Sequence, residues 1–192
     1  MNVTAGRAGT DLAVAPECKF STQKATRVRA LSLLMRWSGL LIIDAASLAK
    51  TELRFANGVY RAVRRRLKTD ILVNNILPTA VAVELLAVPN SNPKYFFWSG
   101  EGTEKTVAGK LTNDLKKAFV KAGTADGHPH PFRGTAAVEL LKAGVDIRKV
   151  SKFLGHSSVT TTEKYYAPWN KAQQDIIDDE IGAAQETMEM HV

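Results

Sequence analysis

The 192-residue chain carries 26 lysine and arginine residues against 19 aspartate and glutamate residues, and its formal net charge is +7. That length is typical of one domain with a sizeable core, and no apolar run approaches the roughly eighteen residues that a membrane span needs. The N-terminal residues lack the charged start and apolar core of a secretion signal. The single cysteine, Cys18, has no partner for an internal disulfide, which favours a cytoplasmic location. The positive charge favours a polyanionic partner.

The charge is divided unevenly along the chain. Residues 172–192 contain six acidic residues and no lysine or arginine, so all 26 basic residues lie before them. This asymmetry suits a DNA-binding body followed by an acidic segment that packs on protein. We therefore expect residues 172–192 to form an acidic helix and tail. The alternative is an ordinary surface helix that is acidic by chance.

The first half of the chain predicts two helices and a small sheet. Residues 1–25 are polar, rich in glycine and alanine, and without periodicity, which favours a flexible leader. Apolar residues at helical spacing then predict a helix over 26–35, a break at Ser38-Gly39, and a second helix over 42–48. Residues 52–73 place apolar residues among charged ones, with a turn near Thr69-Asp70, which predicts an antiparallel hairpin or a three-stranded sheet.

The second half of the chain is predicted to be helical. Pro78 suits the first position of a helix, where a missing N–H costs nothing. A loop around the apolar residues 96–98 separates that helix from a long amphipathic helix over 103–122. Further helices are expected at 131–142, 147–153, 160–166 and 170–184. The predicted fold is therefore mainly α with a small antiparallel β-sheet, an α+β domain.

The segment from His128 to Trp169 contains the most specific pattern of the sequence. It reads H-x-F-R at His130 to Arg133, then L-G-H-S-S around His156, then T-T-E-x-x-Y-A-P-W. This pattern resembles the second conserved block of the tyrosine recombinases, the phage integrase family, which cut and rejoin DNA through a 3′-phosphotyrosyl bond. The resemblance implies the catalytic-domain fold over residues 26–171, double-stranded DNA as partner, and no cofactor. It also implies site-specific recombination, such as the DNA integration of a mobile element.

Three residues of this block are implied to hold the phosphate. Arg133 offers a planar fork of donors that matches two phosphate oxygens. His130 lies three residues earlier, on the same face at the helix start, and can donate to the phosphate or accept a proton. His156 is expected to open a later helix, where the dipole and free N–H groups favour an anion. The resemblance implies active-site roles for all three.

The nucleophile is one of two adjacent tyrosines. Tyr165 and Tyr166 follow His156 by nine and ten residues, and the family uses either spacing. Members that end in H-Y-A-P-W use the tyrosine directly before Ala-Pro-Trp, which favours Tyr166. The other tyrosine would then be a packing residue, since adjacent positions of a helix face about 100° apart.

Lys68 is the candidate general acid. It lies just before the turn predicted at Thr69-Asp70, and the family has a lysine on such a hairpin that protonates the leaving 5′-oxygen. The usual K-T-G is K-T-D here, because Asp70 replaces the glycine. The alternative is an ordinary surface lysine at the end of a basic run that includes Arg66.

The first conserved block departs from the family pattern. Leu41 stands where the family has its first catalytic arginine, although the acidic residue three positions later is kept as Asp44. Arg36 and Arg54 are too far along the chain to be obvious replacements. Losing one cation at a phosphoryl centre typically costs on the order of 10² to 10⁵ in rate. Two hypotheses follow: an impaired but active recombinase, or a non-catalytic DNA-binding remnant of an integrase.

Other features bound these hypotheses. Complete recombinases carry a separate helical domain that clamps the far face of the DNA, and residues 1–25 are too few for it, so we expect weak DNA binding. The resemblance implies that the last helix packs on a neighbouring subunit in a tetramer on DNA, with docking on its own core as the alternative. His128, His130 and His156 lack a cysteine pair or clustered carboxylates, so no metal is expected. A serine hydrolase would need a G-x-S-x-G elbow, which is missing.

Overall fold

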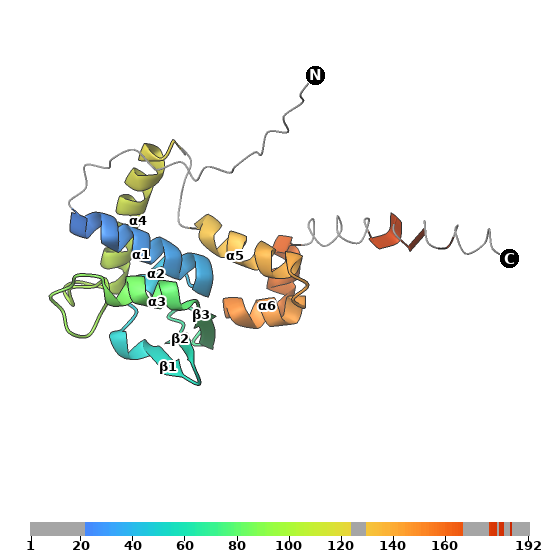
Figure 1. Ribbon diagram of the computed structural model, residues 1–192, viewed down its shortest axis with the longest axis horizontal. Helices are drawn as coiled ribbons and strands as arrows, with labels where there is room; N and C mark the ends of the chain where they lie inside the picture. The colour runs from blue at the N-terminus through green and yellow to red at the C-terminus, as the bar shows by residue number, and fades with distance from the viewer. Residues whose placement is uncertain (1–21, 124–129, 167–176, 180, 183–184, 186–192) are drawn as a thin grey trace, which may run out of the picture.

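The computed structural model describes residues 22–123 and 130–166, with residues 177–179, 181–182 and 185 of the last segment (Figure 1). The elements follow in the order α1 (Thr22–Ser38), α2 (Ile42–Ala46), the 3-10 helix η1 (Lys50–Glu52), β1 (Leu53–Ala56), β2 (Val59–Arg65), β3 (Leu72–Leu77), α3 (Thr79–Leu86), α4 (Glu104–Lys121), α5 (His130–Lys142) and α6 (Ile147–Leu154). Residues 159–166 are also helical. The α+β class predicted from the sequence is confirmed.

The element boundaries differ from the predicted ones at a few places. Helix α1 begins at Thr22, inside the segment predicted as a leader, and continues to Ser38. The sheet has three strands, which is one of the two forms that the sequence predicted. Residues 1–21 and most of the predicted helix 170–184 lie outside the described residues.

The sheet is an antiparallel meander in the order β1-β2-β3. Asn57 and Gly58 join β1 to β2 with φ values of 51° and 77°, the left-handed conformation of a two-residue hairpin turn. A longer turn joins β2 to β3, and the Arg66 N–H closes it on the Ile71 carbonyl at 2.9 Å. Lys68 lies within this turn.

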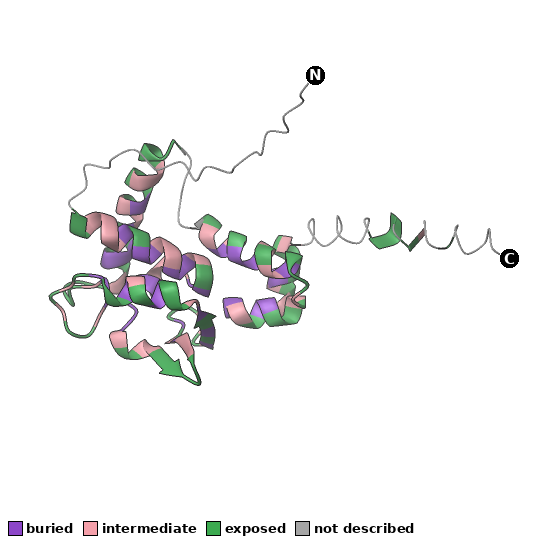
Figure 2. Cartoon of the chain, viewed as in Figure 1, coloured by how far each residue is buried: buried purple, intermediate pink, exposed green. Residues whose placement is uncertain are grey.

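The main hydrophobic core forms around α1. Its buried face contacts α3, α4 and α5 as well as strand β3, because apolar residues recur at helical spacing along it (Figure 2). The loop before α4 contributes Phe96 and Phe97, each only 1% exposed. The buried members of α1 are Val28, Ala30, Leu31, Leu34 and Met35.

A second, smaller core lies between α5 and α6, which form one flank of the molecule (Figure 1). It consists of Ala137, Leu141, Val150 and Leu154, with Tyr166 packed against it. The two cores meet where α1 and α6 end, and we call the meeting of residues 39–44 with residues 153–156 the junction.

Gly39 allows the close approach at this junction. It has a φ of +63°, and a Cβ placed on it would lie 2.6 Å from the Cε1 atom of Phe153. Only glycine meets both conditions without strain. The junction therefore depends on Gly39 at the end of α1, far in the sequence from the site residues of α5 and α6.

Candidate active site

A hollow of about 330 Å³ opens at the junction. The side chains of Lys68, Arg133, His156 and Tyr166, all predicted as site residues, line it. The remaining predicted residue, His130, begins α5, but its side chain lies outside the described part of the chain. The hollow is also lined by Leu41, Arg66, Thr69, Gly155 and Tyr165.

Arg133 bridges the two sides of the junction. Its Nη1 donates to the Gly39 carbonyl, and its Nη2 donates to the Leu154 carbonyl at 2.6 Å. The side chain is only 5% exposed. Burial lowers the pKa of Arg133 to about 10, and the nearby Arg66 charge lowers it as well. At neutral pH the guanidinium therefore still carries its charge.

Arg66 is a second buried guanidinium in the same hollow. Its Nε donates to Oδ2 of Asp44 at 3.2 Å, and the two side chains are 3% and 0% exposed. Its Nη1 donates to the carbonyls of Leu154 and, at 3.1 Å, of Gly155. The other Asp44 oxygen accepts from the Leu67 N–H at 2.9 Å. This pair fixes α2 against the turn that carries Lys68.

The end of α6 holds both arginines. The Leu154 carbonyl accepts from Arg66 and from Arg133, and Gly155 ends the helix with a φ of +63°. A Cβ placed on Gly155 would lie 2.6 Å from Cδ of Arg66 and 2.7 Å from Cγ1 of Val73. A side chain there would displace the Arg66 guanidinium, so the glycine is part of the site.

His156 does not open a helix, and that prediction is wrong. It follows the left-handed end of α6, its N–H donates to the Ser151 carbonyl at 3.1 Å, and the next helical stretch begins at residue 159. Its Nδ1 lies 2.7 Å from Oγ1 of the buried Thr162. Burial, then Arg133 and Arg66, lowers the pKa of His156 to about 4. The imidazole is therefore neutral at pH 7.

The two tyrosines have different surroundings. Tyr165 is 71% exposed, whereas Tyr166 is partly buried and packs against the second core. Burial raises the pKa of Tyr166, and the Arg133 charge opposes that rise. Tyr166 therefore keeps its proton at neutral pH and lies within the electrostatic reach of Arg133.

The missing arginine leaves an apolar wall. Leu41 lies at the N-cap of α2 and lines the hollow. Arg36 lines a different hollow, and Arg54 lies exposed on β1, so neither fills the gap. Arg66 is a residue of the hollow that the family motifs did not indicate. The one signal in the sequence was its place as the last of three consecutive arginines, 64–66, where β2 ends.

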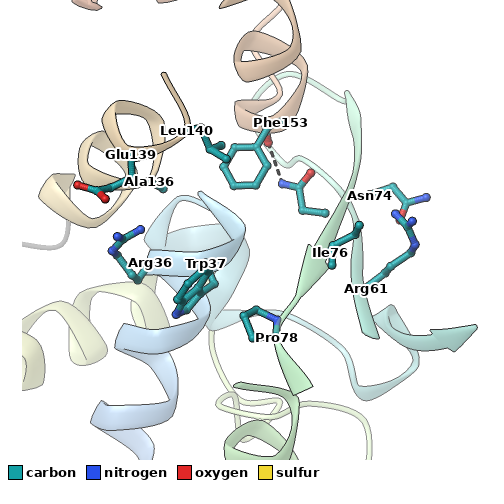
Figure 3. A pocket seen from close by; sticks show the side chains of 11 residues that line it. Arg36, Trp37, Arg61, Asn74, Ile76, Pro78, Ala136, Glu139, Leu140 and Phe153 are labelled. Atoms are coloured by element: carbon teal, nitrogen blue, oxygen red, sulfur yellow. Dashed lines mark hydrogen bonds between the residues drawn. The ribbon is translucent and has the colours of Figure 1, made fainter. Parts of the chain in front are cut away.

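A larger hollow of about 660 Å³ lies beside this site, between the end of α1, β3, α5 and α6 (Figure 3). Trp37 and Phe153 are among the apolar residues that line its wall. The Asn75 amide fixes that wall by donating to the Phe153 carbonyl at 2.8 Å and to the Ser38 carbonyl at 2.7 Å. The residues that line this hollow include no tyrosine, serine, cysteine or histidine, so it offers no hydroxyl, thiol or imidazole nucleophile.

The described residues contain no candidate for a membrane-spanning helix and none for a metal site. In that part of the chain, no helix is both long and apolar enough to span a membrane. The same residues contain no group of three or more histidine, cysteine, aspartate or glutamate side chains placed to hold a metal ion.

Two buried guanidinium groups, a neutral imidazole and a partly buried tyrosine around one hollow define a basic site with a tyrosine in its wall. The model of the phage integrase family matches residues 14–172, and the chain belongs to that family. The resemblance noted in the sequence is confirmed.

Curated relatives are tyrosine recombinases. The chain is 29% identical over 150 residues to a tyrosine recombinase of Thermosipho africanus, covering 76% of this chain and 51% of that one. It is 31% identical over 145 residues to the tyrosine recombinase XerC of Rhodospirillum centenum, covering 72% of this chain and 42% of the relative. The chain thus spans about half the length of these relatives.

Solved structures show the same fold. The XerH recombinase in a post-cleavage complex with difH DNA superposes with a TM-score of 0.64 at 20% identity, over 83% of this chain and 47% of that one. A lambda integrase fragment bound to a core site gives a TM-score of 0.53 at 14% identity, over 74% and 55%. The described domain therefore has the tyrosine-recombinase catalytic fold.

Proposed function

We propose that this chain cuts and rejoins double-stranded DNA by transesterification, with Tyr166 as nucleophile. The observation that carries the proposal is that Tyr166, Arg133 and His156 line one hollow, although the arginine and the tyrosine are 33 positions apart in the sequence. Such a reaction depends mostly on positioning the phosphate and stabilising its developing charge. Buried guanidinium donors are suited to that task.

The reaction balances as an exchange of one ester for another. The Tyr166 oxygen attacks the phosphorus, a phosphotyrosyl bond forms, and the bond to the 5′-oxygen breaks. Since Tyr166 is protonated at neutral pH, its proton must be accepted by a base, and we assign that role to His130, the residue that begins α5. His156, whose pKa is lowered to about 4, is too weak a base for this step and would instead hold the phosphate. Lys68, exposed in the β2–β3 turn at the rim of the hollow, would protonate the leaving 5′-oxygen.

Arg133 and His130 complete the proposed set. Arg133 would turn its donors from the Gly39 and Leu154 carbonyls towards phosphate oxygens. His130 begins the same helix one turn before Arg133, as the resemblance implies for an active-site residue. No step requires a metal or an organic cofactor.

The proposed partner is duplex DNA held by the basic body, with further copies of the chain bound beside it. The acidic residues 172–192 would reach a neighbouring copy, because their charge complements the basic body. Deleting residues 172–192 should then abolish cross-linked oligomers on DNA without abolishing DNA binding. The proposed DNA substrate and the single cysteine favour a cytoplasmic location.

The direct test is relaxation of supercoiled plasmid, with a denaturing gel for the covalent protein–DNA adduct. Tyr166→Phe should abolish both signals, and Tyr165→Phe, its matched neighbour, should retain them. If only Tyr165→Phe abolished relaxation and adduct formation, the nucleophile would be Tyr165 instead of Tyr166. No adduct from the unaltered chain at low salt would favour the non-catalytic remnant.

A further inference from the structure

We infer that Arg66 is a catalytic residue of this site and supplies the phosphate-binding cation that is missing at Leu41. Its free Nη2 would donate to a non-bridging oxygen of the scissile phosphate, opposite Arg133. This inference rests on the proposed function for its place in a reaction. The proposed binding of an anion by Arg66 rests on geometry alone.

The donors of Arg66 are only partly used by the protein. Nε serves Asp44 and Nη1 serves the carbonyls at the end of α6, while Nη2 makes no hydrogen bond with the described residues. In the same part of the chain, the only buried and unpaired side-chain nitrogen or oxygen is Nε of Arg64. Nη2 of Arg66 is therefore not sealed in the protein, and the open space beside it is the hollow that Arg66 lines.

The charge balance of the hollow also favours an anion. Two guanidinium groups and one carboxylate, Asp44, leave an excess of one positive charge at the junction before Lys68 is counted. Arg66 and Arg133 repel each other, since the Arg66 charge lowers the pKa of Arg133. A phosphate between the two would relieve this repulsion.

A neighbouring pair shows what a merely structural arginine looks like. Arg64, two residues earlier, pairs with Glu52 at 2.9 Å and also donates to Ser47. Its surroundings include no histidine and neither Tyr165 nor Tyr166, because it faces another hollow. Both arginines pair with a carboxylate, but only Arg66 is fully buried and lines the site.

The experiment replaces each ion pair by neutral side chains of similar shape, so that no buried charge is left unpaired. Asp44→Asn with Arg66→Gln removes the proposed ligand, and Glu52→Gln with Arg64→Gln is the matched control. We expect the first double variant to form the Tyr166–DNA adduct at least about 100-fold more slowly, as for loss of one transition-state donor. The control should retain the rate.

Leu41→Arg provides the rescue. Added to the Asp44→Asn/Arg66→Gln variant, it should restore much of the adduct formation, because it returns a guanidinium to the wall of the hollow. In the unaltered chain, Leu41→Arg should change the rate of adduct formation little, because Arg66 already supplies the cation. Equal losses in both double variants, or no loss in either, would overturn the inference.

A second readout separates this inference from the proposed function. Orthophosphate should raise the melting temperature of the unaltered chain and of the Glu52→Gln/Arg64→Gln control. The rise should be smaller for the Asp44→Asn/Arg66→Gln variant. If the unaltered chain forms no adduct, the proposed function fails, and the phosphate response still decides the role of Arg66. An equal response in all three proteins would show that Arg66 does not bind phosphate.

Discussion

Replacing Asp44 alone should destabilise the protein far more than replacing it together with Arg66. Asp44→Asn leaves the Arg66 cation buried without its counter-charge, at a site where the two side chains are 0% and 3% exposed. Breaking a buried pair in this way typically costs about 3–5 kcal/mol. The low end, about 3 kcal/mol, applies here, because the Leu154 and Gly155 carbonyls remain as acceptors.

The assay is thermal unfolding at pH 7, followed by calorimetry or circular dichroism. For a chain of this size, about 3 kcal/mol corresponds to a fall in melting temperature of roughly 6–12 °C. Adding Arg66→Gln to Asp44→Asn should recover most of that fall, because no unpaired charge is then buried. Thus the double variant is expected to be more stable than the single variant.

Asp70→Asn is the matched control. Asp70 pairs with Arg65 at 3.4 Å, but its side chain is 84% exposed, so the loss should lie within about 1 kcal/mol. Its φ of 54° is a conformation that asparagine tolerates, so the backbone adds no strain. The reasoning is refuted if Asp44→Asn costs no more than Asp70→Asn, or if the double variant is less stable than Asp44→Asn.

Three other predictions concern the site. Gly155→Ala should lower both stability and adduct formation, whereas Gly144→Ala, at a similar φ but with open space around it, should lower stability alone; parallel effects would contradict the contact with Arg66. Since the pKa of His156 falls from 6.5 to about 4 on folding, the unfolded chain binds a proton in that window that the folded chain does not. The urea midpoint should therefore fall between pH 6.5 and pH 4 more steeply than in His156→Asn, and equal slopes would contradict this. Duplex affinity, measured by fluorescence anisotropy, should fall steeply between low and moderate salt if phosphate contacts dominate, and a flat response would argue against them.

Periodicity predicted the elements well where local patterns decide them. The long helix α4 shows this, since its predicted range of 103–122 nearly matches Glu104–Lys121. The motif that carries Arg133, His156 and Tyr166 also predicted which side chains meet, and these three do line one hollow. Their chemical roles stay predictions.

Arg66 could not be found in the same way. Its acceptors are main-chain carbonyls 88 and 89 residues away, and a carbonyl leaves no mark in a sequence. His156 was misplaced for a related reason: the left-handed Gly155 delays the next helix, so the histidine follows one helix end without opening another. Both Arg66 and His156 thus depend on how α6 ends at Gly155, which the sequence pattern did not predict.

The shared Leu154 carbonyl also bears on when the site forms during folding. Asp44 and Arg66 belong to the part of the chain that is synthesised first, and their pairing spans only 22 residues. The Leu154 carbonyl at the end of α6 lies 88 residues from Arg66, and contacts of such sequence separation form slowly because loop closure opposes them. During synthesis, Arg66 could thus pair with Asp44 before Arg133 has been made. The two arginines would come together at the Leu154 carbonyl only when α6 docks.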